Sequence, residues 1–393
     1  MRLSGDPEVA LFLERALDVL PATSKEAEAE SRPHVHGFHP YPARLHPKTA
    51  ASFIEAFARE PGVVLDPFCG SGTVLVEARA RAHQAIGFDL NPIAILLSTL
   101  KTQSFGAADR DELITVATAV SAEADTRRRA KKGASRRYPQ EDVDGFDPHV
   151  LLELDGLRVG IEKHRAHPLS DVLALVLSAI LAKLSRRDGD TSAGTRAMRI
   201  AAGYPSRLYR AKTAELVTFL ETTETLYGSA PGAMLQLADA RDLRGVRPGS
   251  VDLVVSSPPY PGVYDYVEHH RTRMRWLDLD PRALDRGEIG ARRRLRTLES
   301  RDAMQTFEDD MARLFQSCAR VLTPGGRAVF VIADGALGHV ALRADEILTR
   351  AARRASLVRV ACASQERPHF HGGSQAAFRS RARCEHAMLF SRS

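Results

Sequence analysis

A serine, two prolines and a tyrosine follow an apolar run in the second half of the chain. Residues 256–260 read Ser-Ser-Pro-Pro-Tyr, and the run before them, Val251–Val255, has no glycine. A Val-rich run of this kind predicts a buried strand. Because two prolines cannot continue a ladder of backbone hydrogen bonds, the chain must leave the sheet there as a rigid, extended loop.

Three groups of this loop suit one kind of chemistry. The Ser257 hydroxyl and the Pro258 carbonyl can accept hydrogen bonds from an exocyclic amine, while the Tyr260 ring can stack on a planar base; Pro259 keeps the loop extended. The loop follows the carboxyl end of a strand, which is where open α/β sheets bind ligands. A proline-rich turn with a packed tyrosine would have the same sequence, so the loop alone does not decide between a site and a turn.

A second motif lies nearer the N-terminus. Residues 63–73 read Val-Val-Leu-Asp-Pro-Phe-Cys-Gly-Ser-Gly-Thr and predict a strand, a tight turn and the start of a helix. Gly70 and Gly72 let the backbone approach a ligand closely, and the helix N-terminus supplies free N–H groups. No Gly-Lys-Ser/Thr follows, so this is not a P-loop. Asp89 ends the next short strand, where a βαβ unit places a carboxylate on a ribose.

Together, Asp-Pro-Phe-Cys-Gly-Ser-Gly-Thr and Ser-Pro-Pro-Tyr resemble the S-adenosylmethionine-dependent amino-methyltransferases of DNA, which methylate N4 of cytosine or N6 of adenine. The resemblance covers residues 36–103 and 233–393. It implies a Rossmann-like fold with S-adenosylmethionine as cofactor. It assigns catalysis to Ser257, Pro258, Pro259 and Tyr260, and cofactor binding to Asp66, Pro67, Phe68, Gly70, Gly72, Thr73, Asp89, Asn91, Asp239, Ala240 and Ser256.

Within this resemblance, two acids match residues with defined tasks. Asp89, in Gly-Phe-Asp-Leu-Asn-Pro, matches the acid that holds the cofactor ribose, and Asp239 matches the acid that contacts its adenine. Residues 39–44, His-Pro-Tyr-Pro-Ala-Arg, are similar to the segment that closes over the methionine end. Asp242 competes with Asp239 for its role, and Asp66 could instead cap its own turn, although its place at a strand end favours a cofactor role.

The serine before Pro-Pro-Tyr favours cytosine N4 as the target over adenine N6. Related RNA N2-guanine methyltransferases share a similar first motif but usually carry Asn or Asp at that position. Methylation at cytosine C5 is disfavoured. It needs a thiolate nucleophile, usually from the cysteine of a Pro-Cys pair, and no Pro-Cys pair occurs in the chain. The alternatives are an RNA base methyltransferase and a non-catalytic nucleic-acid-binding relative, although the intact loop argues against the latter.

The composition is that of a globular protein, and its modest positive charge fits a polyanionic partner. The 393 residues carry a net charge of +6, which fits DNA as a partner, although a GC-rich genome would also enrich arginine. The four cysteines form no Cys-x-x-Cys pair, so a reducing cytoplasm is expected. The longest apolar run, Val172–Leu184, is too short for a membrane span, and residues 1–20 lack a signal-peptide pattern. A cognate restriction endonuclease is a possible further partner.

The pattern of elements predicts an α/β fold: a Rossmann-like, seven-stranded, mostly parallel sheet with helices on both faces, plus an α-helical insertion. We expect an N-terminal helix and loop over 1–36, a methyltransferase core over 37–103 and 233–393, and the insertion, a candidate target-recognition region, over 104–232. Within it, a loop is predicted over 133–145 and a helix over 212–227.

Basic residues and histidines suggest two further kinds of site. Candidate phosphate contacts are Arg136, Arg137, Arg186, Arg271 and Arg273. Histidines gather near the N-terminus and again near the C-terminus, but no carboxylate or thiol partner is evident beside them, and methyl transfer needs no metal. No metal site is therefore expected at His34, His36, His39 and His46, or at His369 and His371.

Overall fold

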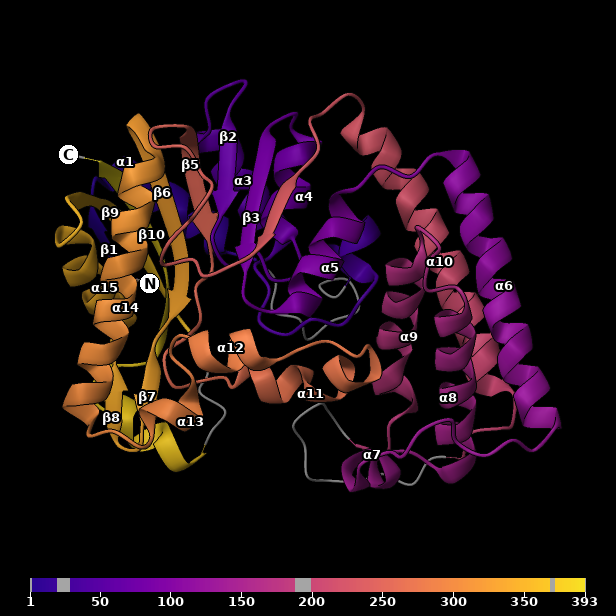
Figure 1. The fold of residues 1–393 in the computed structure, drawn as a ribbon. Coiled ribbons are helices and arrows are strands. Elements are labelled where there is room, and N and C mark those ends of the chain that lie inside the picture. Colours follow the sequence, from indigo (N-terminus) through magenta and orange to yellow (C-terminus); the bar gives the residue numbers. More distant parts are fainter. Residues whose placement is uncertain (1, 20–28, 188–198, 368–371, 393) are drawn as a thin grey trace.

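The computed structural model describes residues 2–19, 29–187, 199–367 and 372–392, and its centre is an eight-stranded sheet (Figure 1). The strands lie in the order β1-β9-β10-β6-β5-β2-β3-β4. Their bounds are β1 Arg2–Gly5, β2 Val63–Asp66, β3 Gln84–Asp89, β4 Met234–Leu237, β5 Val251–Ser256, β6 Leu322–Ala333, β9 Leu357–Glu366 and β10 Cys384–Arg392.

The central strands β4, β3, β2, β5 and β6 pair in parallel, and β10, β9 and β1 continue the sheet in antiparallel pairs. The predicted α/β fold with a mainly parallel sheet is confirmed. The sequence prediction missed β1, because all four of its residues are exposed and it has no buried face to set an alternating pattern. Backbone pairing with β9 holds it at the sheet edge.

Helices cover both faces of the sheet, because alternate residues of a strand point in opposite directions. Val64 of β2 belongs to the apolar cluster under α1, α3 and α4, whereas its neighbour Leu65 belongs to the cluster under α14 and α15. The bounds of these helices are α1 Pro7–Leu17, α3 Pro47–Phe57, α4 Thr73–Ala80, α14 Ser300–Val321 and α15 Ala344–Arg353.

The strand order reverses between β2 and β5. From β2 the chain proceeds outward to β3 and β4, and from β5 it proceeds the other way to β6. Such a reversal opens a crevice at the carboxyl ends of the two strands. Val64 pairs with Leu253 and Leu65 with Val254, so the two motifs that follow these strands emerge side by side.

A group of long helices lies beside the sheet, on the side of α5 (Figure 1). They share one apolar cluster with α5 and α11. A membrane-crossing helix, which would have to be both long and strongly apolar, does not occur among the described residues. The bounds are α5 Pro92–Thr102, α6 Ala107–Arg129, α7 Gln140–Gly145, α8 Pro148–Lys163, α9 Ser170–Leu184, α10 Tyr204–Tyr227 and α11 Tyr266–Trp276.

Two predictions inside this helical region were wrong in their bounds. The helix predicted to begin at residue 212 begins at Tyr204. The predicted loop over 133–145 includes α7, and the stretch before α7 is tied to α8: the Ser135 and Tyr138 hydroxyls donate to the buried Asp155 carboxylate at 2.5 and 2.7 Å. A buried carboxylate with several donors fixes a segment that composition alone marks as a loop.

Short elements complete the chain. In Figure 1, α11 and α12 lie beyond the carboxyl ends of the central strands, where they can close the crevice. The remaining elements are the 3₁₀ helices η1 His34–Gly37 and η2 Gly372–Phe378, the helices α12 Arg282–Gly287 and α13 Arg292–Leu295, and the hairpin strands β7 Gly335–Leu337 and β8 Val340–Leu342.

Candidate active site

A pocket of about 650 Å³, partly open to solvent, lies at the carboxyl edge of β2, β3, β4 and β5. Residues from both sequence motifs line it, so the fold brings together segments far apart in the chain. The predicted site residues that line it are Pro67, Phe68, Gly70, Asp89, Asn91, Asp239, Ala240, Ser257 and Pro259.

Asp89 ends β3 and presents its carboxylate to this pocket. One oxygen accepts the Asn91 N–H at 2.8 Å and the other accepts the Gly70 N–H at 2.9 Å, so the acid also fixes the glycine turn. Burial raises the pKa of Asp89 to about 6, against the lowering effect of these backbone donors. Each carboxylate oxygen keeps a second lone pair. Asp89 can therefore accept hydrogen bonds from two adjacent hydroxyls.

Asp66, which the sequence predicts to bind the cofactor, is not among the residues that line the pocket. It is buried, and its carboxylate accepts the Phe68 N–H at 3.0 Å and the Ser256 hydroxyl at 2.5 Å. Burial raises the pKa of Asp66 to about 7. Asp66 and Ser256 thus join the loops after β2 and β5. Thr73 and Gly72 also lie outside the lining; Gly72 precedes α4 in a left-handed conformation with φ of 83°.

Asp239 follows β4 and lines the pocket, whereas its competitor Asp242 does not. The Arg241 guanidinium holds the Asp239 carboxylate through two nitrogens, at 2.6 and 2.9 Å, and also binds Asp310 at 2.5 Å. These hydrogen bonds outweigh burial and lower the pKa of Asp239. The carboxylate is therefore ionised and fixed in orientation.

The Ser-Pro-Pro-Tyr loop divides its side chains between two cavities. Ser257 and Pro259 line the main pocket, and Pro258 is buried. Tyr260 lies in a second cavity, where its hydroxyl contacts the Glu385 carboxylate at 3.0 Å. Arg367 holds the other oxygen of Glu385 at 3.0 Å. Burial and the Glu385 charge raise the pKa of Tyr260, and Ser257 also hydrogen bonds to its hydroxyl.

The structure adds pocket residues that the sequence did not assign to the site. Tyr41 belongs to the His-Pro-Tyr-Pro-Ala-Arg segment; its hydroxyl accepts from the Asn91 side chain at 3.2 Å, and its ring stacks on His270 with centroids 4.8 Å apart. Tyr266 and Glu288 join the lining, and the Glu288 carboxylate accepts the Tyr266 N–H at 2.5 Å. The motif around Tyr41 signalled its role, but no pattern marked Glu288 beforehand.

The five arginines predicted to contact nucleic acid do not form one surface. Arg273 is buried, which excludes a phosphate contact in this conformation. Arg136 pairs with Asp278 at 2.6 Å and donates to the Arg275 carbonyl. The other three, Arg137, Arg186 and Arg271, are at least partly exposed. Arg186 lies 3.8 Å from Asp147, and Arg271 pairs with Glu268.

The lining of the main pocket fits S-adenosylmethionine. Asp89 and Asp239 offer carboxylates at successive strand ends, suited to a ribose diol and an adenine amine. Phe68, Leu90 and Ile289 provide apolar surface for a purine ring. Cys69 lies in the same turn but is buried, and burial raises the pKa of its thiol, so it is a packed residue and not a nucleophile.

Comparison with known proteins points to the same chemistry. Residues 17–99 match the family model described as DNA methylase. The chain is similar to the Type II methyltransferase M.MjaII of Methanocaldococcus jannaschii, with 34% identity over 79 residues, 20% of this chain and 15% of that protein. It is also similar to the Type II methyltransferase M.MvaI of Kocuria varians, with 41% identity over 70 residues, 17% of this chain and 15% of that protein.

A third relative acts on RNA by its name. A tRNA (guanine(10)-N2)-dimethyltransferase of Methanothermobacter thermautotrophicus is 32% identical over 91 residues, 23% of this chain and 27% of that protein. The chain thus spans about a quarter or less of each of these relatives. The chain is thus similar to the DNA methylase family over residues 17–99, and to the two Type II methyltransferases over a fifth of its length or less.

Proposed function

We propose that this protein methylates the exocyclic amine of a base in DNA, with N4 of cytosine as the favoured target. The observation that carries the proposal is the shared pocket: Ser257 of the Ser-Pro-Pro-Tyr loop lines the same cavity as Asp89 and Asp239. A base amine held at Ser257 would then lie next to a nucleoside held by the two acids. The register of β2 against β5 is what brings these segments together.

The cofactor would be held at three places along the pocket. Asp89 would accept hydrogen bonds from the ribose hydroxyls and Asp239 from the adenine amine, while Tyr41 would lie at the methionine end. S-adenosylmethionine would supply a methyl group already activated by its sulfonium. The protein therefore needs to orient the acceptor and to exclude water, and orientation alone can lower a barrier by about 7–11 kcal/mol.

The loop would prepare the amine for attack. The lone pair of a cytosine amine is delocalised into the ring, which makes it a weak nucleophile. The Ser257 hydroxyl and the Pro258 carbonyl would accept its two hydrogens and draw the nitrogen toward tetrahedral geometry. Because the loop is fixed by two prolines and by the Ser256–Asp66 bond, its acceptors are preorganised for this geometry.

Tyr260 would stack on the extruded base, since chemistry on a base requires that it leave the helix. Its ring lies beside the second cavity, which Arg44, His46, Arg367 and Glu385 also line. The cavity therefore supplies polar groups next to the stacking ring. In the structure the Tyr260 hydroxyl is engaged with Glu385, so we propose that this bond sets the ring before a base arrives.

Adenine N6 is the alternative target within DNA, and the serine before Pro-Pro-Tyr favours cytosine. A second candidate function is methylation of a base in RNA, because the chain is similar to a tRNA (guanine(10)-N2)-dimethyltransferase. Methylome sequencing of a methylation-free bacterial host that expresses the protein tests both DNA targets. The matched control is the same host with Ser257→Ala.

We expect N4-methylcytosine at one short sequence motif, and none with the Ser257→Ala protein. N6-methyladenine in its place would contradict the choice of base. Unmodified DNA, together with a new methylated guanine in the tRNA of the same cells, would overturn the proposal in favour of the RNA function.

A further inference from the structure

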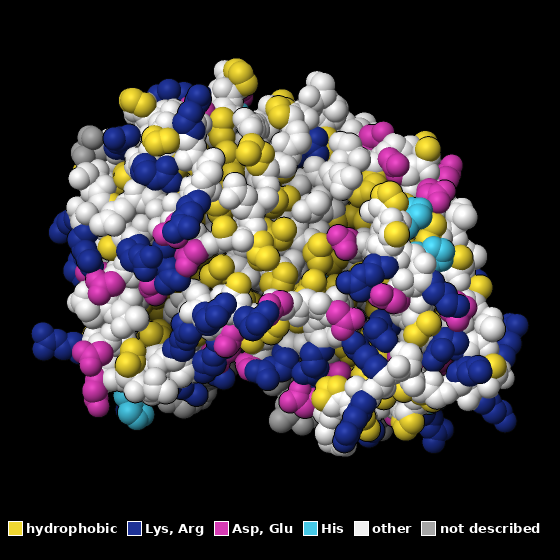
Figure 2. All heavy atoms as spheres, in the orientation of Figure 1, with side chains coloured by type: hydrophobic (Ala, Val, Ile, Leu, Met, Phe, Trp, Pro, Cys, Tyr) yellow, Lys and Arg dark blue, Asp and Glu magenta, His cyan; other side chains and the backbone are white. Residues whose placement is uncertain are grey.

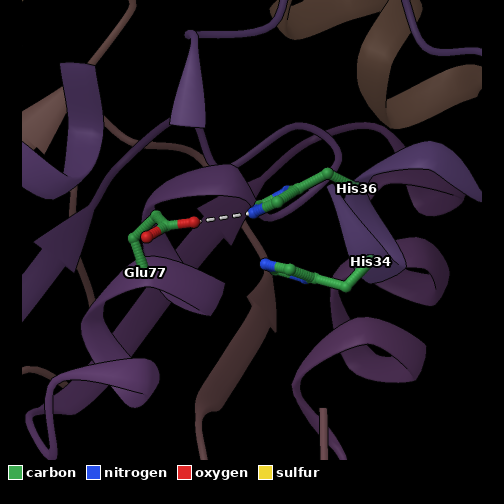
Figure 3. Close-up of side chains that lie close together, drawn as sticks. All are labelled: His34, His36 and Glu77. Atoms are coloured by element: carbon green, nitrogen blue, oxygen red, sulfur yellow. Dashed lines mark hydrogen bonds and ion pairs between the residues drawn. The ribbon is translucent and has the colours of Figure 1, made fainter. Parts of the chain in front are cut away.

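Two histidines and a glutamate meet outside the candidate active site. His34 and His36 belong to η1, and Glu77 belongs to α4, the helix after the glycine turn. Figure 3 shows both imidazoles pointing toward Glu77. One ligand atom from each residue lies within 4.8 Å of those of the other two, and His36 Nε2 is 2.9 Å from a Glu77 oxygen. Figure 3 thus shows a carboxylate partner for these histidines that no spacing in the sequence revealed.

The two imidazoles are held in place, but some of their nitrogen atoms have no hydrogen-bond partner among the described residues. His36 is fully buried, and the Nδ1 atoms of His34 and His36 have no hydrogen-bond partner among the described residues. His34 adopts a φ of 37°, a left-handed conformation that is strained for a residue with a side chain. Strain that the surroundings maintain is often connected with function.

Metal ligation needs neutral imidazoles and an ionised carboxylate. Burial lowers the pKa of both His34 and His36, which favours their neutral forms. Arg81 binds the other Glu77 oxygen at 2.7 Å and opposes the rise in the pKa of Glu77 that burial causes. Lys101 and Arg44 add positive charge near the histidines, and burial lowers the pKa of Lys101 to about 7.

A second cluster in the fold provides a contrast. Asp334, Asp345 and His386 also lie within 4.8 Å of one another. There, Arg343 and Arg381 bind the two carboxylates at 2.8 and 2.7 Å, as Arg81 binds Glu77 in the first cluster, but the histidine differs. His386 donates to Asp334, which helps to raise the pKa of this histidine to about 9, so it is protonated and cannot ligate. This cluster is an ion-pair network.

We propose that His34, His36 and Glu77 bind one Zn²⁺ ion, with the fourth position left to water. Two imidazoles and one carboxylate are an established ligand set for this ion, with metal–nitrogen distances of about 2.0–2.1 Å. To ligate through Nε2, His36 would carry its single proton on Nδ1, and the metal would then lie between Nε2 and the Glu77 carboxylate in place of their hydrogen bond. It would also fasten η1 to α4, and η1 leads directly into the segment that carries Tyr41 to the pocket.

Metal binding to the full-length protein tests this proposal without any methylation assay, so the result is independent of the proposed function. The protein is stripped with a chelator and titrated with Co²⁺, whose visible absorption reports the ligand geometry, and then with Zn²⁺ in competition. We expect one ion per chain. Replacing a ligand should weaken binding by roughly 100-fold or more, because even partners of metal ligands contribute about 10–100-fold.

The variants are His34→Ala and Glu77→Gln. The matched control is His339→Ala, because His339 is exposed and is distant in sequence from the three proposed ligands. The control should bind like the wild type. Glu77→Gln disturbs a buried hydrogen bond and requires a check of folding by circular dichroism. His34→Ala breaks no hydrogen bond at Nδ1, which has no partner among the described residues, but it removes a ring that packs on His36, so its folding is checked in the same way. Equal affinities for the wild type and His34→Ala, or no bound Zn²⁺ in the wild type, would overturn the proposal.

Discussion

Asp89 must be ionised to accept hydrogen bonds from a ribose, and its pKa is raised to about 6 by burial. Protonation below that pH removes acceptor lone pairs. We therefore expect the affinity for S-adenosylmethionine to be constant above pH 7 and to fall about tenfold per pH unit below pH 6, because one proton competes with binding. Calorimetric titration between pH 5 and 8 measures this dependence.

The Asp89→Asn variant separates this effect from other titrations, since Asp66 has a pKa of about 7 in the same region. It should bind more weakly by about 1.5–3 kcal/mol, the range for a hydrogen bond to a charged group. Its affinity should not change between pH 5 and pH 6.5. A variant with the pH dependence of the wild type would show that another group is responsible.

Tyr260 allows its ring and its hydroxyl to be tested apart. If the ring stacks on the base, Tyr260→Ala should lose roughly 1–3 kcal/mol of stabilisation, the range for base–aromatic stacking. Tyr260→Phe keeps the ring and loses the hydroxyl contacts with Glu385 and Ser257, so it should retain most activity if the ring carries the role. Methylation rates at saturating cofactor concentration distinguish the role of the ring from that of the hydroxyl, and cofactor affinity is measured as a control. Equal losses in both variants would assign the role to the hydroxyl.

At the scale of residues, sequence motifs identified about half of the residues that line the pocket, and several residues predicted to bind the cofactor lie outside the lining. Asp89 and Asp239 line it, because each directly follows or ends a strand at the carboxyl edge. Asp66 meets the same criterion but turns inward to Ser256, a partner 190 residues away. Glu288 reaches the pocket from a segment with no recognisable pattern. Long-range partners of this kind are not encoded in local spacing.

Among the elements, the turn before α4 depends on Gly72. Its φ of 83° is left-handed, and a Cβ there would lie 3.1 Å from the Ser98 Cα in α5. A side chain in this conformation costs roughly 1–2 kcal/mol before any clash is counted. We expect Gly72→Ala to lower the free energy of unfolding by at least about this amount, measured by urea denaturation.

The matched control is Gly133→Ala, in the stretch between α6 and α7. There an added Cβ would have no heavy atom within 4 Å, and the backbone is not left-handed. Its unfolding free energy should stay close to that of the wild type. A Gly72→Ala protein as stable as this control would mean that the turn tolerates a side chain.

Elements with a regular pattern and a buried face were predicted well, and elements fixed by single contacts were not. The strands β2 and β5 have Val-rich runs, so the sequence indicates them directly. By contrast, α10 begins at Tyr204 because Glu153, buried in α8, accepts the Gly203 N–H at 2.9 Å just before it. The missed β1 depends on pairing with a strand from the far end of the chain.

At the scale of the whole molecule, β–α alternation was sufficient to predict the fold class but not the placement of the helical region. The helices α6, α8, α9 and α10 share an apolar cluster with α5 and with α11, which lies after the Ser-Pro-Pro-Tyr loop. This packing positions the region beside the carboxyl edge of the sheet, where α11 and α12 also lie (Figure 1). Shared burial between distant segments cannot be derived from the pattern of either one.

The face that contains this edge has a hollow lined by hydrophobic side chains, with Lys and Arg side chains gathered below it around α11, α12 and α13 (Figure 2). A base that leaves a duplex needs such an arrangement: an apolar recess for the ring and cations for the backbone. We propose that DNA lies across this face and that the helical region contributes Arg137 and Arg186.

Salt dependence of DNA binding tests this arrangement. Each phosphate contact contributes about 0.9 to the slope of log affinity against log salt concentration. The double variant Arg137→Glu and Arg186→Glu should therefore bind more weakly and lower the slope by about two units. Arg165→Glu is the control. Arg165 is highly exposed and follows the C-terminal end of α8, whereas Arg186 lies beside Asp147 at the N-terminal end of that helix. Cofactor affinity should be unchanged in all three proteins, since the pocket lies elsewhere. Wild-type slopes in the double variant would remove the helical region from the DNA surface and leave the arginines around α11–α13 as its only basic part.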